Sequence, residues 1–182
     1  MSPKGLPRII ETHDLLIRQV REEDAALMFQ EIDDDRERLG RFLPWVDSIK
    51  TLKDEINFVR DAQKKWLKCE QFNYAIFLKP NLYYVGNISV HSLNWDDESA
   101  EIGYWILGKQ EGKGLMLESV NRLTQILFHE GLHRIQIRCD AENIRSTKVP
   151  ERAGFHFEGM LLNEQKLAQG IFRSTMCFSK TK

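Results

Sequence analysis

Residues 104–116 constrain the fold of this chain more than any other stretch, because they join an apolar run, a short polar turn and a helical pattern. The apolar run is Tyr104–Leu107, and the turn carries glycines at 112 and 114. The first backbone N–H groups of a helix lack partners, and the helix dipole places partial positive charge at that end. Glycine has no Cβ atom to keep a ligand away from these donors, and Lys113 adds a cation. The stretch therefore predicts a strand, a diphosphate-binding turn and a helix.

Two better-known phosphate motifs do not match this turn. Leu115 stands where a P-loop needs a hydroxyl side chain for magnesium. Leu117 breaks the Gly-x-Gly-x-x-Gly dinucleotide pattern, and the stretch lies beyond the middle of the chain rather than in an opening βαβ unit. Because Gly-x-Gly also occurs in ordinary tight turns, a turn that binds no ligand remains the alternative.

The size and charge of the chain restrict its partners. Its 182 residues suffice for one domain with a substantial core, so we expect a single domain over residues 1–182 with a mobile start at 1–13. With 26 basic and 27 acidic residues, no overall field attracts nucleic acid or a membrane, and we expect neither as a direct partner. The sequence shows neither an export signal nor an apolar run of membrane-spanning length.

The cysteines indicate neither a disulfide framework nor a metal site. Cys69, Cys139 and Cys177 are far apart and odd in number, with no Cys-x-x-Cys pair and no histidine cluster at metal spacing. The acidic run 33–35 is more typical of a solvated helix end than of a metal site. We therefore expect a reduced cytoplasmic protein without a bound metal.

The hydrophobic pattern predicts a mixed α/β fold. Seven segments have the pattern of strands: 14–20, 72–78, 83–91, 100–107, 133–139, 154–159 and 172–178. Five segments have helical patterns: 21–33, 36–46, 51–68, 115–130 and 144–152. Thr51 and Asp54 fit a helix N-terminal capping box, and Gly131 fits a C-terminal cap. Since a helix separates the strands at 100–107 and 133–139, these two strands should be parallel.

Three segments leave their details open. The segment 36–46 carries Phe42 and Trp45, which either roof a substrate cleft or pack this helix on the sheet. Pro150 is tolerable only early in a helix, so the start of the helix before residue 152 is open. A polar loop is expected at 163–170, between the last two strands.

Four motifs, in this order and spacing, resemble one family: residues 100–105 (Ala-Glu-Ile-Gly-Tyr-Trp), the turn at 111–114, the pair Asn143 and Ser146, and residues 151–155 (Glu-Arg-Ala-Gly-Phe). Together they resemble the GNAT superfamily of acetyl-CoA-dependent N-acetyltransferases. The chain is most similar to its RimJ/RimL branch of ribosomal-protein N-terminal acetyltransferases. Residues 36–45 also resemble a pattern of this branch, Arg-x-x-Leu-x-x-Trp/Phe-Leu-x-Trp. The resemblance covers essentially the whole chain. It implies a GNAT fold, with a central mixed seven-stranded sheet flanked by four or five helices, and acetyl-CoA as cosubstrate without a metal.

The acyl-CoA turn of this superfamily, Gln/Arg-x-x-Gly-x-Gly/Ala, falls here on residues 111–116: Glu111, Gly112, Lys113, Gly114, Leu115 and Met116. By this resemblance, their backbone N–H groups would hold the diphosphate of acetyl-CoA. Glu111 replaces Gln or Arg, and Met116 replaces a small residue. Because backbone groups hold the ligand, Glu111 need not abolish binding, but its negative charge would weaken it.

The chemistry needs a base, an oxyanion donor and an acid, because an amine attacks a thioester only when it is neutral. By resemblance, a backbone N–H near Ile106 or Leu107 would hold the acetyl carbonyl. Glu101 is the first candidate for the base, since it matches a strand carboxylate of some family members and apolar neighbours would raise its pKa; a purely structural carboxylate is the alternative. His91 is the second candidate. Glu164, in the last loop, corresponds loosely to a carboxylate proposed as base in this branch.

The pair at 143 and 146 would act on the coenzyme. By resemblance, Ser146 is the candidate acid or hydrogen-bond donor to the CoA sulfur, and Asn143 a partner for the pantetheine amides. Either could instead only cap the helix that follows. Cys139 occupies an apolar strand position without a neighbouring base in the sequence, which favours buried packing over a covalent acetyl intermediate.

The sequence thus predicts an enzyme that moves an acetyl group from acetyl-CoA to an amine, with the N-terminal amine of a protein such as a ribosomal protein as the first candidate. Trp45 and Glu164 are the candidate acceptor-binding residues. A small-molecule acceptor, such as a polyamine, amino acid or antibiotic, is one alternative, and a non-catalytic acyl-CoA sensor is another. Homodimerisation is expected from the resemblance alone.

Overall fold

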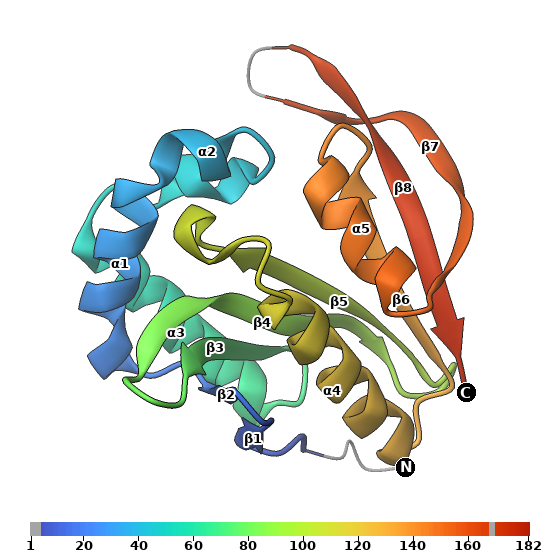
Figure 1. Ribbon diagram of the computed structural model, residues 1–182, viewed down its shortest axis with the longest axis horizontal. Coiled ribbons are helices and arrows are strands. Elements are labelled where there is room, and N and C mark those ends of the chain that lie inside the picture. Colours follow the sequence, from blue (N-terminus) through green and yellow to red (C-terminus); the bar gives the residue numbers. More distant parts are fainter. Residues whose placement is uncertain (1–4, 168–169) are drawn as a thin grey trace.

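The computed structural model describes residues 5–167 and 170–182. A single eight-stranded sheet runs through the molecule in the order β1-β2-β3-β4-β5-β6-β8-β7 (Figure 1). Its strands are β1 (Ile9–Glu11), β2 (Leu15–Gln19), β3 (Phe72–Leu78), β4 (Tyr83–Asn94), β5 (Ser99–Ile106), β6 (Arg134–Asp140), β7 (His156–Lys166) and β8 (Phe172–Thr181). The pair β5 and β6 is parallel, as the connecting helix predicted, and every other neighbouring pair is antiparallel.

Five α-helices and three short 3₁₀ helices complete the described part of the chain. The α-helices are α1 (Ala25–Asp34), α2 (Arg36–Gly40), α3 (Leu52–Leu67), α4 (Leu115–His129) and α5 (Ile144–Arg152). The 3₁₀ helices are η1 (Glu22–Asp24), η2 (Pro44–Ser48) and η3 (Gly108–Gln110). The expected caps are confirmed: Thr51 and Asp54 form a capping box on α3, and Gly131 follows α4 with a φ of +101°.

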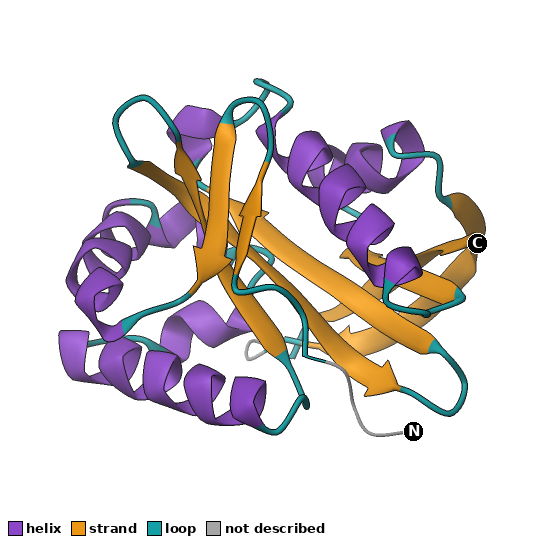
Figure 2. Ribbon diagram, turned by 90° about the horizontal axis from the view of Figure 1, so that it is seen from below, coloured by secondary structure: helices purple, strands orange, loops and turns teal. Residues whose placement is uncertain are grey.

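The sheet is covered on both faces, and β3 shows how the sequence achieves this (Figure 2). Tyr74 and Ile76 point into a core cluster that includes the apolar side of α4. Ala75 and Phe77 alternate with them and point into a second cluster, which includes residues of α1 and α3. Because both faces are covered, β3 is buried almost from end to end.

The described structure has eight strands rather than the expected seven. The additional strand is β1, which pairs with β2 in the segment that we expected to be mobile. Ile10 explains this pairing, since its side chain is only 2% exposed and packs in the main core. A three-residue strand leaves too short an alternation to be found from the sequence. Residues 1–4 lie outside the described part of the chain.

Two expected segments end differently. The helix expected at 36–46 stops at Gly40, and η2 starts at Pro44, where proline favours a helix start rather than a helix interior. The polar loop expected at 163–170 is shorter, because β7 continues to Lys166; residues 168–169 lie outside the described range. Glu164 therefore lies on a strand and not in a loop.

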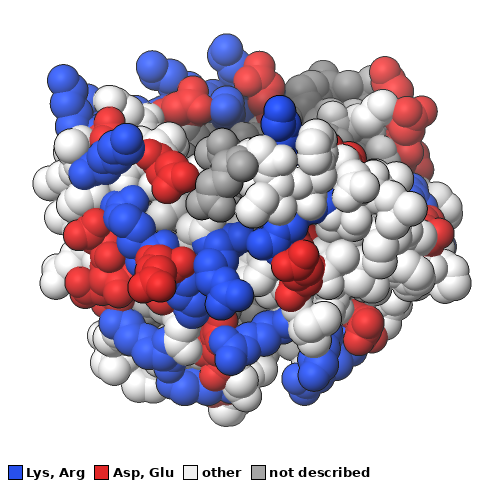
Figure 3. All heavy atoms as spheres, turned by 90° about the horizontal axis from the view of Figure 1, so that it is seen from above, with Lys and Arg blue, Asp and Glu red and all other residues white. Residues whose placement is uncertain are grey.

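Acidic and basic side chains are interspersed on the face that carries α2 and the outer end of the β7–β8 hairpin (Figure 3). This mixture agrees with the nearly balanced count of 26 basic and 27 acidic residues. Among the described residues, no helix is both long and apolar enough to cross a membrane.

Candidate active site

The parallel strands β5 and β6 separate soon after they meet. Their register joins Ser99 to Arg134, Ala100 to Ile135 and Glu101 to Gln136, and the described pairing ends there. Beyond this point the remaining halves of the two strands diverge, and a cleft of about 1060 Å³ fills the split. The cleft is lined by residues of α2, the glycine turn before α4, α5 and the β7–β8 hairpin, and α2 and the hairpin stand apart in Figure 1.

The glycine turn leaves its backbone open to the cleft. Gly112 has a φ of +76° and Gly114, which precedes the first residue of α4, has a φ of +79°. These are left-handed conformations that favour glycine. A Cβ atom at either position would meet no described atom within 4 Å, so space in front of the turn is free for a ligand. Lys113 donates to the side chain of Gln110 at 2.8 Å.

The end of β5 presents one backbone N–H toward the split. Leu107 N–H donates to the Val85 carbonyl of β4 at 2.9 Å, so it points away from β6. Successive residues of an antiparallel strand turn their backbone groups to opposite sides. The N–H of Ile106 therefore faces the split, and the Ile106 carbonyl on the same side accepts a hydrogen bond from Arg38 at 2.7 Å.

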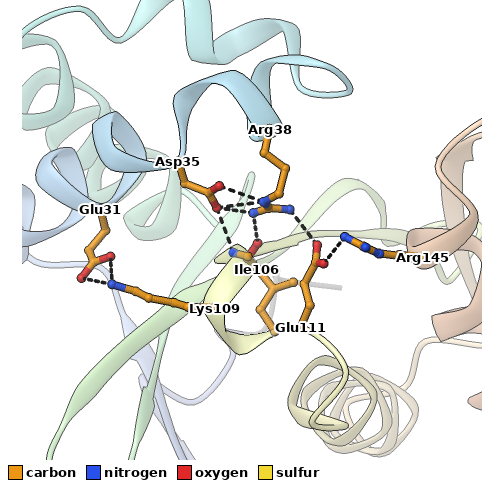
Figure 4. Close-up of polar contacts among 8 residues, drawn as sticks. Glu31, Asp35, Arg38, Ile106, Lys109, Glu111 and Arg145 are labelled. Atoms are coloured by element: carbon orange, nitrogen blue, oxygen red, sulfur yellow. Dashed lines mark hydrogen bonds and ion pairs between the residues drawn. The ribbon is translucent and has the colours of Figure 1, made fainter.

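Glu111 is neutralised by two arginines (Figure 4). Arg38 of α2 donates to one carboxylate oxygen at 2.7 Å, and Arg145 of α5 donates to the other at 2.5 Å. The Arg38 guanidinium also binds Asp35, whose carboxylate accepts the Gly108 N–H at 2.9 Å. Burial acts to raise the pKa of Asp35, but the hydrogen bonds from Arg38 and Gly108 lower it below its ordinary value. This network joins α2, the glycine turn and α5 across the cleft.

Glu101 lies at the apex of the split, where the β5–β6 pairing ends. Its side chain is 13% exposed, and its neighbours are polar rather than apolar as we had expected. Gln136 donates to one carboxylate oxygen at 3.4 Å, and the His91 ring lies 4.0 Å from the other. His91 faces Glu101 across β4 and β5, and the absence of a side chain at Gly103 gives the ring its place.

Side chains from β5, β6 and α5 meet around Ser146. Asn143 caps α5 by accepting the Ser146 N–H at 3.2 Å, which confirms a capping role for this residue. The Ser146 hydroxyl lies 3.4 Å from the Cys139 sulfur and 3.5 Å from the Tyr104 hydroxyl. Cys139 is buried, as expected, and burial raises the pKa of its thiol.

Glu164 lies on the hairpin wall and is held by two partners. Thr175 donates to one of its carboxylate oxygens at 2.7 Å, and Arg138 binds the other. These hydrogen bonds lower the pKa of Glu164 below its ordinary value. A carboxylate with a lowered pKa is a weaker proton acceptor, which counts against Glu164 as the base.

The aromatic residues of the segment after α2 divide between the two roles considered for them. Phe42 lines the cleft and lies under the Arg173 guanidinium of β8, 5.8 Å from its ring centroid, so the segment after α2 and the hairpin meet there. Trp45 instead packs against Trp105, with their ring centroids 5.7 Å apart. Trp105 itself lines the cleft, so Trp45 supports the wall from behind.

Comparison with known proteins agrees with this geometry. Residues 14–156 match the model of the acetyltransferase (GNAT) domain. The chain belongs to this family. It is 31% identical over 166 residues to the "Putative ribosomal N-acetyltransferase YdaF" of Bacillus subtilis (strain 168), covering 89% of this chain and 85% of the relative. It is 26% identical over 151 residues to the ribosomal-protein-serine acetyltransferase of Escherichia coli (strain K12), covering 82% and 83%.

Solved structures show the same fold. The microcin C7 self-immunity acetyltransferase MccE, in complex with acetyl-CoA and AMP, matches with a TM-score of 0.91 and 21% identity over 100% of this chain and 99% of its own. RimL, an L7/L12 alpha-N-protein acetyltransferase in complex with CoA, matches with a TM-score of 0.89 and 22% identity over 95% and 97%. The chain is thus an acetyl-CoA-dependent N-acetyltransferase of the GNAT type.

Most residues that we had selected from the sequence line the cleft of this acetyltransferase. These are Glu101, Ile106, Glu111, Gly112, Gly114, Leu115, Met116, Asn143, Ser146 and Glu164. Met116, which replaces a small residue, is buried, and its side chain packs in the main core. Within the described part of the chain, four selected residues are not among those that line the cleft: His91, Leu107, Lys113 and Trp45.

The structure adds residues that we had not selected for the acetyltransferase site. Arg38, Arg138 and Arg145 neutralise its carboxylates, and no local pattern in the sequence marks them. Tyr104 was considered only as part of a strand, yet its hydroxyl lies beside Ser146. The sequence did contain a signal for a contact at Ser146. Pro150 lies inside the helix expected at 144–152, and a proline there leaves the carbonyl of Ser146, four residues earlier, in need of another donor. Within the described residues, no three His, Cys, Asp or Glu side chains form a group that could hold a metal ion.

Proposed function

We propose that this N-acetyltransferase acetylates the N-terminal amine of a protein, such as a ribosomal protein. The observation that carries the proposal is the cleft in the split between β5 and β6, whose lining includes the glycine turn, residues of α2 and residues of the β7–β8 hairpin. Acetyl-CoA on the turn and an acceptor amine in the same cleft would meet near Glu101 and Ser146, which both line it. The names of the two curated relatives support a ribosomal protein as acceptor.

Acetyl-CoA would bind along the open edge of β5. Its diphosphate would accept hydrogen bonds from the backbone N–H groups of residues 112–116, at the positive end of the α4 dipole. Its pantetheine amides would pair with free backbone groups on the β6 side of β5, and with the side-chain amide of Asn143. The absence of other described atoms within 4 Å of a Cβ atom at Gly112 or Gly114 supports this placement.

The transfer would follow from the groups around the apex. Glu101 would accept the proton of the acceptor ammonium, directly or through a water molecule, since the attacking amine must be neutral. The Ile106 N–H would donate to the oxyanion that forms when the amine adds to the thioester carbonyl. Ser146 would donate to the departing CoA sulfur. His91, 4.0 Å from Glu101, is the second candidate for the base, and Glu164 is the third because its pKa is lowered.

A small-molecule amine is the second candidate for the acceptor. It is favoured by the fold match to MccE, whose complex contains AMP beside acetyl-CoA. A non-catalytic acyl-CoA sensor is the third candidate, because Glu111 departs from the family pattern of the turn. The ion pairs of Glu111 with Arg38 and Arg145 weaken this argument, because they give the carboxylate counter-charges beside the turn.

We also propose that the protein is a cytoplasmic homodimer that associates through β7. This strand forms the edge of the sheet, and four of its apolar side chains are exposed: Phe157, Met160, Leu161 and Leu162. Long apolar edge strands invite pairing with another chain. Light scattering should give twice the chain mass of 21.4 kDa, and a Leu162→Lys variant should give the monomer mass. A monomeric wild-type protein would exclude this assembly.

The first experiment tests the coenzyme site. Calorimetric titration with acetyl-CoA and with CoA should show micromolar binding, and Gly114→Glu should abolish it by bulk and charge at the turn. Gly131→Glu is the matched control, because Gly131 lies at the other end of α4, also with positive φ and open space. Loss of binding in both variants would indicate misfolding of the helix. An absence of binding in the wild type would exclude both the transferase and the sensor.

The second experiment identifies the acceptor. Release of CoA thiol is measured with peptides that carry free N-termini, including those of ribosomal proteins, and with polyamines, amino acids and aminoacyl nucleotides. The proposal expects turnover with a subset of peptides, abolished by N-terminal acetylation but not by acetylation of internal lysines. Turnover with small amines alone would establish the second candidate. Binding of CoA without any turnover would establish the sensor.

A further inference from the structure

Helix α5 carries a proline where a helix normally needs a hydrogen-bond donor. Pro150 is the seventh of the nine residues of α5. In an α-helix the N–H of residue 150 would donate to the carbonyl of Ser146, four residues earlier. Proline has no N–H, and its ring crowds that carbonyl. The Ser146 carbonyl therefore needs a donor from outside this helical ladder.

The Tyr104 hydroxyl supplies this donor. Its Oη atom lies 2.8 Å from the Ser146 carbonyl oxygen, on a residue 42 positions away in the sequence. Tyr104 belongs to β5, beyond Glu101, where β5 and β6 no longer pair. The hydrogen bond thus spans the split and joins the strand that carries the acetyl site to the helix that carries Ser146.

The same hydroxyl orders the groups around it. Its oxygen lies 3.5 Å from the Ser146 hydroxyl and 3.7 Å from the Cys139 sulfur, while Ser146 and Cys139 lie 3.4 Å apart. Since the Tyr104 proton is directed to the carbonyl, the Tyr104 oxygen can act toward the Ser146 hydroxyl only as an acceptor, in exchange with the Cys139 sulfur or another acceptor. Burial raises the pKa of Tyr104 well above its ordinary value, so the hydroxyl keeps the proton that it donates.

We infer that Tyr104 is a positioning residue of this acetyltransferase: it replaces the N–H that Pro150 lacks and thereby holds Ser146 against β5 at the thioester end of the cleft. The part that concerns Ser146 rests on the proposed function, in which Ser146 donates to the CoA sulfur. Tyr104 itself does not deliver a proton in this arrangement, because its only proton is committed to a backbone carbonyl. A positioning residue and a proton donor make different experimental predictions.

A double-mutant cycle tests the structural part. Pro150→Ala restores an N–H that can donate to the Ser146 carbonyl, so the Tyr104 hydroxyl becomes dispensable there. Tyr104→Phe should lower the Tm of the wild type, and at least half of that loss should disappear in the Pro150→Ala background. Tyr74→Phe is the matched control, because the buried Tyr74 hydroxyl also donates to a backbone carbonyl, that of Pro7, at 3.0 Å. Its loss of Tm should be the same in both backgrounds.

Steady-state kinetics test the positioning part. Tyr104→Phe should lower kcat about 10-fold to 100-fold, the size expected for a small displacement of a reacting group. KM for the acceptor should change little, and the pH–rate profile should keep its shape because no titrating group is lost. Tyr74→Phe should leave kcat unchanged.

Three results would overturn the inference. An equal loss of Tm for Tyr104→Phe in both backgrounds would show that the hydroxyl does not replace the missing N–H. An unchanged kcat in a destabilised Tyr104→Phe variant would show that the contact holds the helix without positioning Ser146. Loss of one limb of the pH–rate profile would make Tyr104 a proton donor instead. The Tm cycle needs neither acetyl-CoA nor an acceptor, so a wild type without turnover would defeat the proposed function while the cycle still gave its own answer.

Discussion

Glu55 on α3 is a buried carboxyl group, and it makes the stability of the folded chain depend on pH. The residue is 1% exposed, and its Oε1 atom has no hydrogen-bond partner among the described residues. Burial raises its pKa from 4.5 to about 7, because the charged form loses its hydration without gaining a counter-charge. The folded state therefore binds a proton that the unfolded chain releases near pH 4.5.

The sign and the size of the effect follow from this difference. A raised pKa in the folded state contributes stability that is complete below pH 4.5 and is lost as the pH rises through about 7. A shift from 4.5 to about 7, at about 1.4 kcal/mol per unit, corresponds to about 3 kcal/mol. This is a large part of the ~5–15 kcal/mol by which domains are stable.

Glu55→Gln should remove this dependence, because glutamine keeps the shape of the side chain and cannot ionise. Urea unfolding of both proteins over about pH 5 to 8 gives the free energy of unfolding at each pH, and other titrating groups cancel in the difference. The wild type should lose about 2.5 kcal/mol relative to the variant across this range, because part of the total loss has already occurred at pH 5. Glu23→Gln, at a glutamate whose side chain is 68% exposed, should give curves parallel to the wild type. Parallel curves for Glu55→Gln would refute the reasoning.

Three further predictions concern the acetyl-CoA turn, a helix cap and the end of β5. Glu111→Gln should tighten CoA binding about 3-fold to 10-fold in calorimetry at low salt, and less at high salt, because Arg145 is released and a negative charge leaves the proposed diphosphate site. Weaker binding would show that the carboxylate instead holds Arg145 in place. Thr51→Ala should lower the free energy of unfolding by about 1 kcal/mol in urea without changing kcat, and a loss below a few tenths would mean that the capping box contributes little. Gly86→Ala should lower both stability and kcat, because its Cβ would lie 2.3 Å from the Trp105 carbonyl oxygen on β5. Gly159→Ala is the control: its φ is +156° and no described atom lies near its Cβ, so kcat should be unchanged.

Local patterns predicted the parts of this fold that depend on neighbours in sequence. The alternation in β3 and the spacing along α4 follow from burial on one face or on both, and the cap at Thr51 follows from two residues three positions apart. The parallel pairing of β5 and β6 followed from the helix that lies between them in the sequence. The glycine turn was found for the same reason, since the need for positive φ is a local property of each residue.

Contacts between distant residues could not be predicted in this way. Arg38 and Glu111 are 73 positions apart, and nothing near either residue specifies the other. The length of β7 was underestimated because its outer half pairs with β8 without being buried, so it lacks the alternation that marks a half-buried strand. Exposed strands of this kind are held by backbone hydrogen bonds, which do not depend on side-chain identity.

Two residues that look unfavourable in the sequence have the same explanation in the structure. Glu111 places a negative charge beside the proposed diphosphate site, and Pro150 removes a hydrogen bond from a helix. Each defect is compensated by a side chain from another element that crosses the cleft: Arg38 and Arg145 for Glu111, and Tyr104 for Pro150. A local defect thus creates a demand that only a long-range contact can meet, and the contact fixes the relative position of the elements that it joins. In this acetyltransferase both contacts span the space between α2, β5 and α5, where acetyl-CoA and the acceptor would have to be aligned, so departures from local rules point to the contacts that set the geometry of the cleft.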